Sequence, residues 1–242
     1  MSAITSLKIN LGEESNNIYP VILSDEQEII LVDCGYPGFW PLIKEAAMLE
    51  GLDINKLTKV IITHHDFDHM GALAEIKREL PNVQIMASID DEKYVSGKEK
   101  SLRLQQAESI YETLPESEKE NAKAFQSMLE SVETVKVDIC LHDKEILDCL
   151  GGIEIIATPG HMPGHISLYI KEKQILIAGD AVVIENGVLT IANPQYTLDM
   201  EEAKKSIRKL MDYKISKIIC YHGGIYTDNI KEAFDNIVNK DN

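Results

Sequence analysis

Histidine and aspartate are concentrated in residues 63–69 of this chain, whose sequence is THHDFDH. This stretch follows the apolar run Val60-Ile61-Ile62 and precedes an apolar-periodic segment that starts at Gly71, so we expect it where a strand turns into a helix. Imidazoles together with carboxylates suit a divalent metal that performs hydrolysis better than they suit structural zinc, and the chain contains no Cys-x-x-Cys. The stretch therefore predicts a metal site that acts on a substrate.

Three later segments could supply the rest of a coordination sphere. They are TPGH at 158–161, AGD at 178–180 and YHGG at 221–224. Each places His or Asp at the end of an apolar run, next to glycine or proline that would bend the chain there. An apolar run that ends in a possible ligand thus occurs four times along the chain.

In their order and spacing, these motifs resemble the signature of the metallo-β-lactamase superfamily. That signature is an Asp after an early strand, His-x-His-x-Asp-His, a Pro-Gly-His segment, a Gly-Asp and a late His. The match runs from Asp33 to His222 and covers nearly the whole chain. The resemblance implies an α/β fold of the four-layer αββα sandwich type, formed by a single domain over residues 1–242.

Carried over onto this sequence, the resemblance implies seven metal-binding side chains. They are His64, Asp66 and His161 for one ion, Asp68, His69 and His222 for a second ion, and Asp180 as a bridge between the two. Asp33 would support the metal loops through hydrogen bonds without touching a metal. His65 follows His64 directly and would point to the opposite face of an extended segment, so we expect it to support the ligands or to pack in the interior. We expect His165 to support the ligands without binding a metal.

Position 66 departs from the family pattern, which has His where this chain has Asp. Two divalent ions carry about four positive charges, and Asp66, Asp68, Asp180 and a bridging hydroxide would return about four negative ones. We therefore expect a nearly neutral cluster and a weaker Lewis acid than with His, unless the metal is harder than zinc. Zinc is the first expectation for the two divalent ions, and Asp66 makes iron or manganese the alternatives.

The reaction implied by the resemblance is hydrolysis, in which a metal-bridging hydroxide attacks a small ester, lactone, thioester or amide-like bond. Asp68 would orient the attacking water, and Tyr196 or Tyr226 could donate a hydrogen bond to the oxyanion or leaving group, a role inferred from position alone. Lactonase-like branches match better than hydroxyacylglutathione hydrolases, because the C-terminal third lacks an additional helical domain.

Two functions from other classes stay open at this point. The first is a di-iron redox protein acting on oxygen, nitric oxide or a sulfur species, which Asp66 favours and the lack of a flavin-binding domain disfavours. The second is a non-catalytic metal-binding protein that serves as a sensor or scaffold.

The segment at about 90–135 is the part that the resemblance determines least. It is charged and helix-prone, and Pro115 interrupts it, so we expect two or three helices with one apolar face. Such an insertion could form a lid or wall over a substrate pocket. It could equally be a solvated cover for a sheet edge or a contact in a homodimer.

The remaining elements follow from hydrophobic periodicity and capping signals. Strands are expected near residues 6–11, 18–23, 28–32, 59–63, 84–87, 153–158, 166–170, 174–178 and 217–220. The clearest helices are expected at 41–50, 69–80, 200–213 and 229–239, the third of them after the capping pair Asp199 and Glu202.

Composition narrows the partners to a small-molecule substrate. A formal net charge of −16 argues against nucleic acid, which needs clustered Lys and Arg. Residues 1–17 lack an apolar signal core, and no run reaches the roughly 20 apolar residues of a membrane span, so we expect a cytoplasmic protein without membrane contact. The four cysteines have no framework spacing and are expected to be free thiols.

Overall fold

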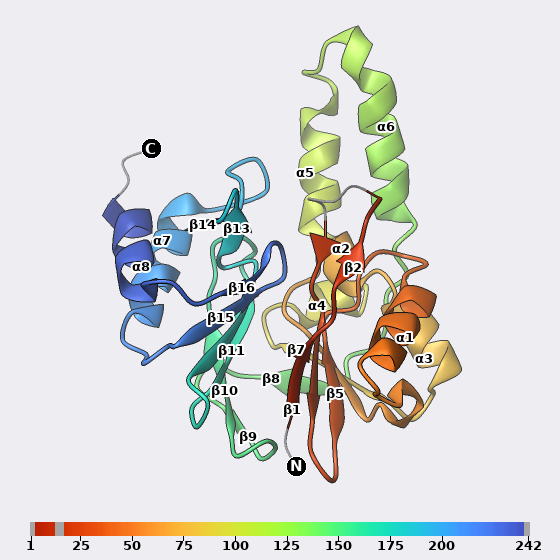
Figure 1. The fold of residues 1–242 in the computed structure, drawn as a ribbon. Helices are drawn as coiled ribbons and strands as arrows, with labels where there is room; N and C mark the ends of the chain where they lie inside the picture. Colours follow the sequence, from red (N-terminus) through yellow and green to blue (C-terminus); the bar gives the residue numbers. More distant parts are fainter. Residues whose placement is uncertain (1–2, 13–16, 240–242) are drawn as a thin grey trace.

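The computed structural model describes residues 3–12 and 17–239, and within them two six-stranded sheets face each other (Figure 1). In spatial order, the first sheet consists of β1 (Ala3–Ser6), β4 (Val21–Ser24), β5 (Ile29–Val32), β6 (Lys59–Ile62), β7 (Gln84–Ser88) and β8 (Ile139–Leu141). The second consists of β16 (Gly224–Tyr226), β15 (Lys217–Cys220), β12 (Ile175–Gly179), β11 (Ile166–Ile170), β10 (Ile153–Ala157) and β9 (Ile146–Leu147).

Both sheets are mixed, and the parallel strands place several carboxyl ends side by side. Strands β5 to β8 pair in parallel, whereas β1, β4 and β5 pair in antiparallel fashion. In the second sheet β12 and β15 are parallel and the other neighbours antiparallel. Because parallel strands end at the same edge of their sheet, the loops after β5 and β6 lie together, and so do the loops after β12 and β15.

The alternation of side chains along each strand explains the layers. In β6, Ile61 faces the second sheet and packs with Leu168 and Ile177, whereas Val60 and Ile62 face the opposite way. On that outer face lie α1 (Trp40–Leu49) and α3 (Leu73–Glu79). Helices α7 (Met200–Leu210) and α8 (Ile230–Asn239) cover the outer face of the second sheet. The expected four-layer αββα sandwich is therefore confirmed.

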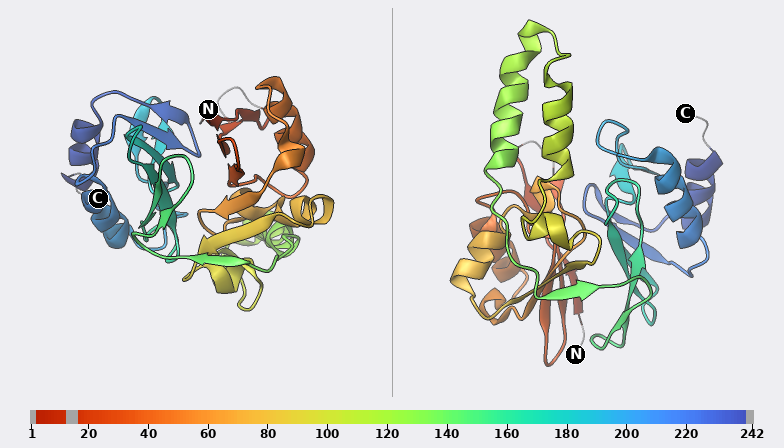
Figure 2. Two further views of the ribbon diagram at one scale, coloured as in Figure 1. Left: turned by 90° about the horizontal axis from the view of Figure 1, so that it is seen from below. Right: turned by 180° about the vertical axis from the view of Figure 1, so that it is seen from behind.

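The insertion forms three helices, α4 (Glu92–Val95), α5 (Leu102–Tyr111) and α6 (Glu116–Glu130). Pro115 directly precedes α6, as the sequence predicts. Leu104, Ala107 and Leu129 join α5 and α6 into a hairpin. Figure 1 and the right-hand view of Figure 2 show this hairpin standing out beyond the sheets, so it does not cover a sheet edge.

Some predicted element boundaries are wrong. The strands expected at 6–11 and 18–23 are each divided, which adds the short pair β2 (Ile9–Asn10) and β3 (Asn17–Ile18). Pro20, which has no N–H for a sheet ladder, lies between β3 and β4. The helix expected at 69–80 is also divided, into α2 (Phe67–Met70) and α3. The break contains Gly71, whose backbone lies so close to Pro37 that a Cβ would be 2.3 Å from the Pro37 nitrogen.

Several short elements were not predicted, namely the strands β8, β9, β13 (Val183–Glu185), β14 (Val188–Thr190) and β16 and a 3-10 turn, η1 (Ile54–Lys56). All four cysteines are free, as expected. Among the helices described, none combines the length and apolar character that crossing a membrane requires.

Candidate metal centre

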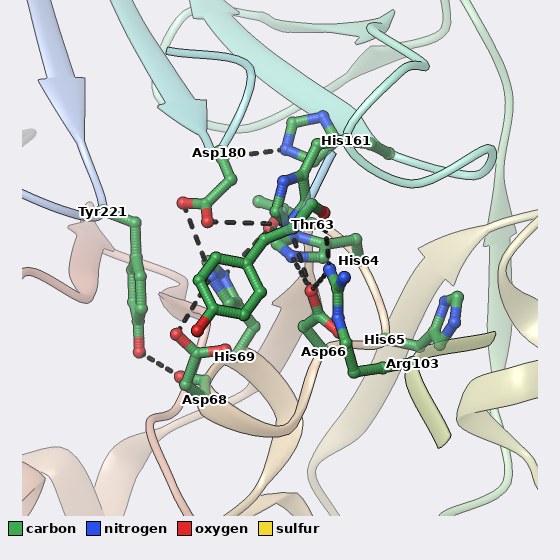
Figure 3. Close-up of polar contacts among 12 residues, drawn as sticks. Thr63, His64, His65, Asp66, Asp68, His69, Arg103, His161, Asp180 and Tyr221 are labelled. Carbon is green, nitrogen blue, oxygen red and sulfur yellow. Dashed lines mark hydrogen bonds and ion pairs between the residues drawn. The ribbon is translucent and has the colours of Figure 1, made fainter. Parts of the chain in front are cut away.

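The predicted ligands come together where strands of both sheets end. Residues 63–69 follow β6, Asp180 follows β12, and His222 lies two residues beyond β15. His161 lies in the loop between β10 and β11. Figure 3 shows Asp180 and His161 coming from the second sheet toward His64, Asp66, Asp68 and His69 of the first.

The first predicted set, His64, Asp66 and His161, is buried and compact. Asp66 Oδ2 lies 3.1 Å from His161 Nε2 and 3.6 Å from His64 Nε2. One ligand atom of each residue lies within 4.8 Å of those of the other two. The geometry therefore suits a single ion held by these three side chains.

The second predicted set, Asp68, His69 and His222, is equally compact. Asp68 Oδ2 lies 3.1 Å from His222 Nε2 and 3.8 Å from His69 Nε2. Asp68 and His69 lie within α2, so the stretch 63–69 is extended only in its first part and helical at its end. His222 is the most accessible ligand, with 31% of its side chain exposed.

Asp180 lies between the two sets. Its Oδ1 is 3.5 Å from His69 Nε2, and its Oδ2 is 3.7 Å from His161 Nε2 and 3.5 Å from His222 Nε2. Asp180, His64 and His69 also form a third group of converging ligand atoms. This position suits the bridging role, which stays a prediction.

Several buried atoms of the centre fit a bound metal. His64 Nε2, His69 Nε2 and Asp180 Oδ1 have no hydrogen-bond partner among the described residues. Such atoms are costly to bury unless something satisfies them. Burial and the neighbouring His69 lower the pKa of His64 well below its usual value, which keeps its imidazole in the neutral form that binds metals.

Charges within the centre keep Asp180 ionised. Burial alone would raise the pKa of Asp180, but the neighbouring His222 and His69 hold it well below its usual range. The pKa of His69 is raised in turn, because the charges of Asp180, Asp33 and Asp68 outweigh burial. The Asp180 carboxylate is therefore in the state in which it can bind a cation.

Asp33 has the supporting role expected of it. Its carboxylate accepts hydrogen bonds from the backbone N–H of Thr63 at 2.8 Å and from the Thr63 hydroxyl at 2.8 Å, and it lies 2.9 Å from His69 Nδ1. Its φ of +60° is in the left-handed region that Asp tolerates better than most residues. Asp33 thus ties the end of β6 to one ligand of the second set.

Two further side chains hold ligands through hydrogen bonds. His165 Nε2 accepts from the backbone N–H of Asp180 at 2.9 Å, which confirms its expected place beside the ligands. The hydroxyl of Tyr221 donates to the backbone oxygen of Asp68 at 2.5 Å. Figure 3 shows Tyr221 next to Asp68.

His65 points away from the ligands, as expected. Its Nδ1 lies 2.7 Å from Asp91 Oδ1, and its Nε2 accepts from the backbone N–H of Leu102 at 3.3 Å. Its ring stacks on Tyr94, with 4.3 Å between the ring centroids. His65 therefore connects the metal loop to the insertion.

Sequence reasoning missed Arg103, which forms a bidentate ion pair with Asp66 (Figure 3). Its Nε lies 3.1 Å from Asp66 Oδ1 and its Nη2 lies 2.6 Å from Oδ2, and the residue is only 2% exposed. Burial opposes ionisation of Asp66, but contacts with His161 and His64 and the charge of Arg103 hold its pKa well below its usual range.

The charge count made from the sequence is therefore wrong at position 66, because it left out this guanidinium. The sequence did hold one indication that Arg103 is buried. Arg103 is adjacent to Leu104 and four residues before Ala107, so it lies on the same face of α5 as these buried apolar residues.

A cavity of about 340 Å³ opens onto the centre. Besides the ligands, its walls are largely aromatic and aliphatic, with contributions from Tyr36, Phe67, Val183, Ile184 and Tyr196. Tyr196 thus lines the cavity as expected, whereas Tyr226 lines a separate hollow.

Tyr36 also lines the cavity and was not predicted from the sequence, although it follows Asp33 by three residues. Burial and the charges of Asp68 and Asp180 raise its pKa, so its phenol stays protonated and able to donate.

The family model described as the metallo-beta-lactamase superfamily matches residues 11–222. The "Probable metallo-hydrolase YflN" of Bacillus subtilis is 29% identical over 226 residues, which cover 86% of this chain and 80% of that protein. The "Hydroxyacylglutathione hydrolase GloC" of Haemophilus influenzae is 30% identical over 210 residues, which cover 86% and 85%. These names agree with the expected enzyme class, a metal-dependent hydrolase.

Among solved structures, a metallo-beta-lactamase family protein from Thermus thermophilus aligns with a TM-score of 0.76 at 19% identity, covering 97% of this chain and 78% of that one. A superfamily protein from Sulfolobus tokodaii aligns with a TM-score of 0.70 at 21% identity, covering 100% and 88%. Both likenesses concern the fold. From the matched family model, the ordered motifs and the two facing sheets, we conclude that this chain belongs to the metallo-β-lactamase superfamily.

Proposed function

We propose that this protein is a dinuclear metal-dependent hydrolase that cleaves a small ester, lactone, thioester or amide-like bond. The observation that carries the proposal is the convergence of buried ligand atoms of His64, His69 and Asp180. His64 Nε2, His69 Nε2 and Asp180 Oδ1 have no hydrogen-bond partner among the described residues, and Asp180 lines a cavity. When bound, two divalent ions would supply an activated water and a Lewis acid for the substrate carbonyl. The two sets of three ligands, with Asp180 between them, would hold these ions.

Asp68 is the best-placed proton acceptor in the cavity. Its carboxylate lines the cavity, and 12% of its side chain is exposed. The hydroxyl of Tyr221 fixes its backbone, and His222 Nε2 lies 3.1 Å from its Oδ2. With the ions bound, the Asp68 carboxylate would therefore be held where it can accept a proton from the attacking water and later deliver it to the leaving group.

Two phenols are available as donors to the developing oxyanion. Tyr36 lines the cavity in its protonated form, and Tyr196 lines another part of the wall with 43% of its surface exposed. A donor of this kind contributes by stabilising charge that develops in the transition state. The partly buried Tyr36 is a second candidate beside Tyr196 because buried donors act in a lower dielectric.

The cavity supports a small, largely apolar substrate. Its volume is at the lower end of the range of small-molecule sites, about 300–1,000 Å³. Among the described residues that line the cavity, Arg103 is the only Lys or Arg. Its guanidinium is paired with Asp66, so it does not offer a free positive charge to a substrate. The net charge of −16 also supports a small-molecule substrate over nucleic acid.

The decisive experiment combines metal analysis by plasma mass spectrometry with turnover of lactones, esters and thioesters by protein purified without tag or chelator. About two zinc or manganese ions per chain together with turnover would support the proposal. Thioesters belong in the panel because of the name of the Haemophilus relative. A metal-loaded protein without turnover of any substrate class would contradict it. Two irons per chain with an oxygen-sensitive visible spectrum would instead support the redox alternative. That alternative rests on the negative charge of Asp66, which the paired Arg103 offsets.

A further inference from the structure

We infer that Asp66 and Arg103 act as one neutral unit that takes the place of the histidine in the family pattern. The inference rests on the proposed metal centre and concerns how this chain keeps a carboxylate in a position where the pattern has an imidazole. Arg103 does not contact the substrate bond or the attacking water in the proposed reaction. It is a positioning residue that acts through Asp66.

Arg103 is committed to Asp66 by its burial and its contacts. Among the described residues, Asp66 is the only carboxylate that forms an ion pair with it. The other contacts of the guanidinium are neutral: Nη1 donates to Gln106 Oε1 at 2.8 Å, and Nη2 donates to the backbone oxygen of Tyr196 at 2.7 Å. A guanidinium buried to this degree depends on its anionic partner, because an unpaired buried charge is strongly disfavoured.

The ion pair leaves Asp66 free to face the other ligands. Arg103 takes one lone pair on each carboxylate oxygen, whereas a carboxylate offers about four lone-pair sites in all. The same Oδ2 that meets Nη2 also lies 3.1 Å from His161 Nε2 and 3.6 Å from His64 Nε2. Asp66 thus presents an oxygen to the first set while the cation binds its other side.

The charges of this arrangement match those of the family pattern. A neutral histidine would add no charge to the first set, and Asp66 alone would add one negative charge. Asp66 together with Arg103 adds none. A metal in the first set would therefore experience the field expected beside an imidazole, and its Lewis acidity would not be reduced by the substitution at position 66.

Adjacent side-chain contacts between the metal loop and the start of α5 hold the two partners in register. Consecutive residues of the metal loop, His65 and Asp66, contact consecutive residues of the insertion, Leu102 and Arg103. The His65 contact is itself fixed by Asp91, so the guanidinium is positioned by a rigid neighbour. The first turn of α5 is therefore part of the structure that supports the metal centre.

The test compares variants with substitutions at positions 66 and 103. For each variant, the affinity of the first ligand set for metal is measured by competition with a chromophoric chelator. Asp66→His restores the family residue but leaves Arg103 unpaired, so we expect the affinity for zinc to fall about tenfold or more. Asp66→His combined with Arg103→Met removes the cation, and we expect the affinity to recover. Asp66→His with Arg103→Lys keeps the cation, and we expect it to stay low.

The comparison of Lys with Met separates charge from shape, because both are long, unbranched side chains. Equal affinities of these two double variants would overturn the inference, as would Asp66→His alone binding both zinc ions as tightly as the wild type. Cobalt substitution adds a spectroscopic readout of the ligand field in each variant.

A second measurement keeps the inference testable if Asp66→His does not fold. In the Asp66 background, Arg103→Met should raise the preference for manganese over zinc several-fold, because the freed carboxylate is a harder ligand, whereas Arg103→Lys should leave it unchanged. An unchanged preference in both variants would overturn the inference. Wild-type protein without metal would contradict the proposed function instead, so the two failures are distinguishable.

Discussion

Replacing Asp33 by Asn should weaken metal binding while leaving the fold largely intact. The Asp33 carboxylate lies 2.9 Å from His69 Nδ1. In the neutral imidazole that a metal requires, this contact keeps the proton on Nδ1 and directs the Nε2 lone pair toward the second ligand set. Asn has the same shape, tolerates the φ of +60°, and can still accept from the backbone N–H of Thr63 through its Oδ1.

The amide of Asn would then face His69 Nδ1 with an N–H, where Asp33 presents an oxygen. The proton of His69 would move to Nε2, and a protonated nitrogen cannot bind a metal. The opposite orientation of the amide would set its N–H against the N–H of Thr63. We therefore expect the metal affinity of the second set to fall about 10- to 100-fold, the usual effect of losing such a partner, which corresponds to about 1.4–2.8 kcal/mol.

Asp33→Ala is the matched comparison, because it should damage the fold as well. It removes the Asp33 acceptor of three buried donors, the backbone N–H of Thr63, the hydroxyl of Thr63 and the Nδ1–H of His69, at about 1–3 kcal/mol for each donor left without another partner. It also places Ala at a left-handed φ, which costs about 1–2 kcal/mol. The free energy of unfolding should therefore fall by about 3 kcal/mol or more for Ala and by about 1 kcal/mol for Asn.

The assay pairs urea unfolding of the metal-free variants with chelator competition in the folded state. An Asn variant that binds both ions like the wild type would refute the tautomer reasoning. Equal losses of stability in the Asn and Ala variants would refute the separation of folding from metal binding.

Three further predictions concern the centre and its cavity. Asp180→Ala should abolish turnover and lower the bound metal measured by plasma mass spectrometry, and an unchanged metal content would contradict the bridging role. Tyr36→Phe and Tyr196→Phe should be compared by kcat: the true oxyanion donor should show a loss of about 10²-fold or more, with little change in KM, and a small effect in both would remove phenols from the proposal. Gly179→Ala should destabilise the metal-free protein in urea, because Gly179 has a φ of +54° and its Cβ would lie 2.7 Å from His165 Nε2; a loss below about 0.5 kcal/mol would argue against this close packing.

The sequence identified side chains that the fold brings together because the signal is local. Each ligand segment follows a short apolar run, and strands of that kind end at a common edge when they pair in parallel. The order of the motifs then identified the superfamily and its layered fold. Neither step required knowledge of side-chain contacts between distant segments.

The parts that sequence reasoning missed depend on such contacts. Arg103 meets Asp66 across 37 residues, and a charged residue in a charged helical segment is ordinarily solvated. Tyr36 reaches the cavity from the loop after β5, which lies beside α2: the Tyr36 and Phe67 ring centroids are 5.5 Å apart. The hairpin of β13 and β14, which supplies Val183 and Ile184 to the cavity wall, is too short to stand out by periodicity.

The contacts of the insertion also bear on whether it is a lid. A rigid-body opening of α4, α5 and α6 would have to separate Leu102 from His65 and Arg103 from Asp66, all at the metal loop. Breaking the buried ion pair alone would leave two uncompensated charges, at a cost of about 3–5 kcal/mol. The outer part of the α5 and α6 hairpin stands clear of the sheets (Figure 1). Motion that admits substrate should therefore bend the hairpin beyond Arg103, or move the loop that carries Tyr196, while the start of α5 stays fixed to the centre.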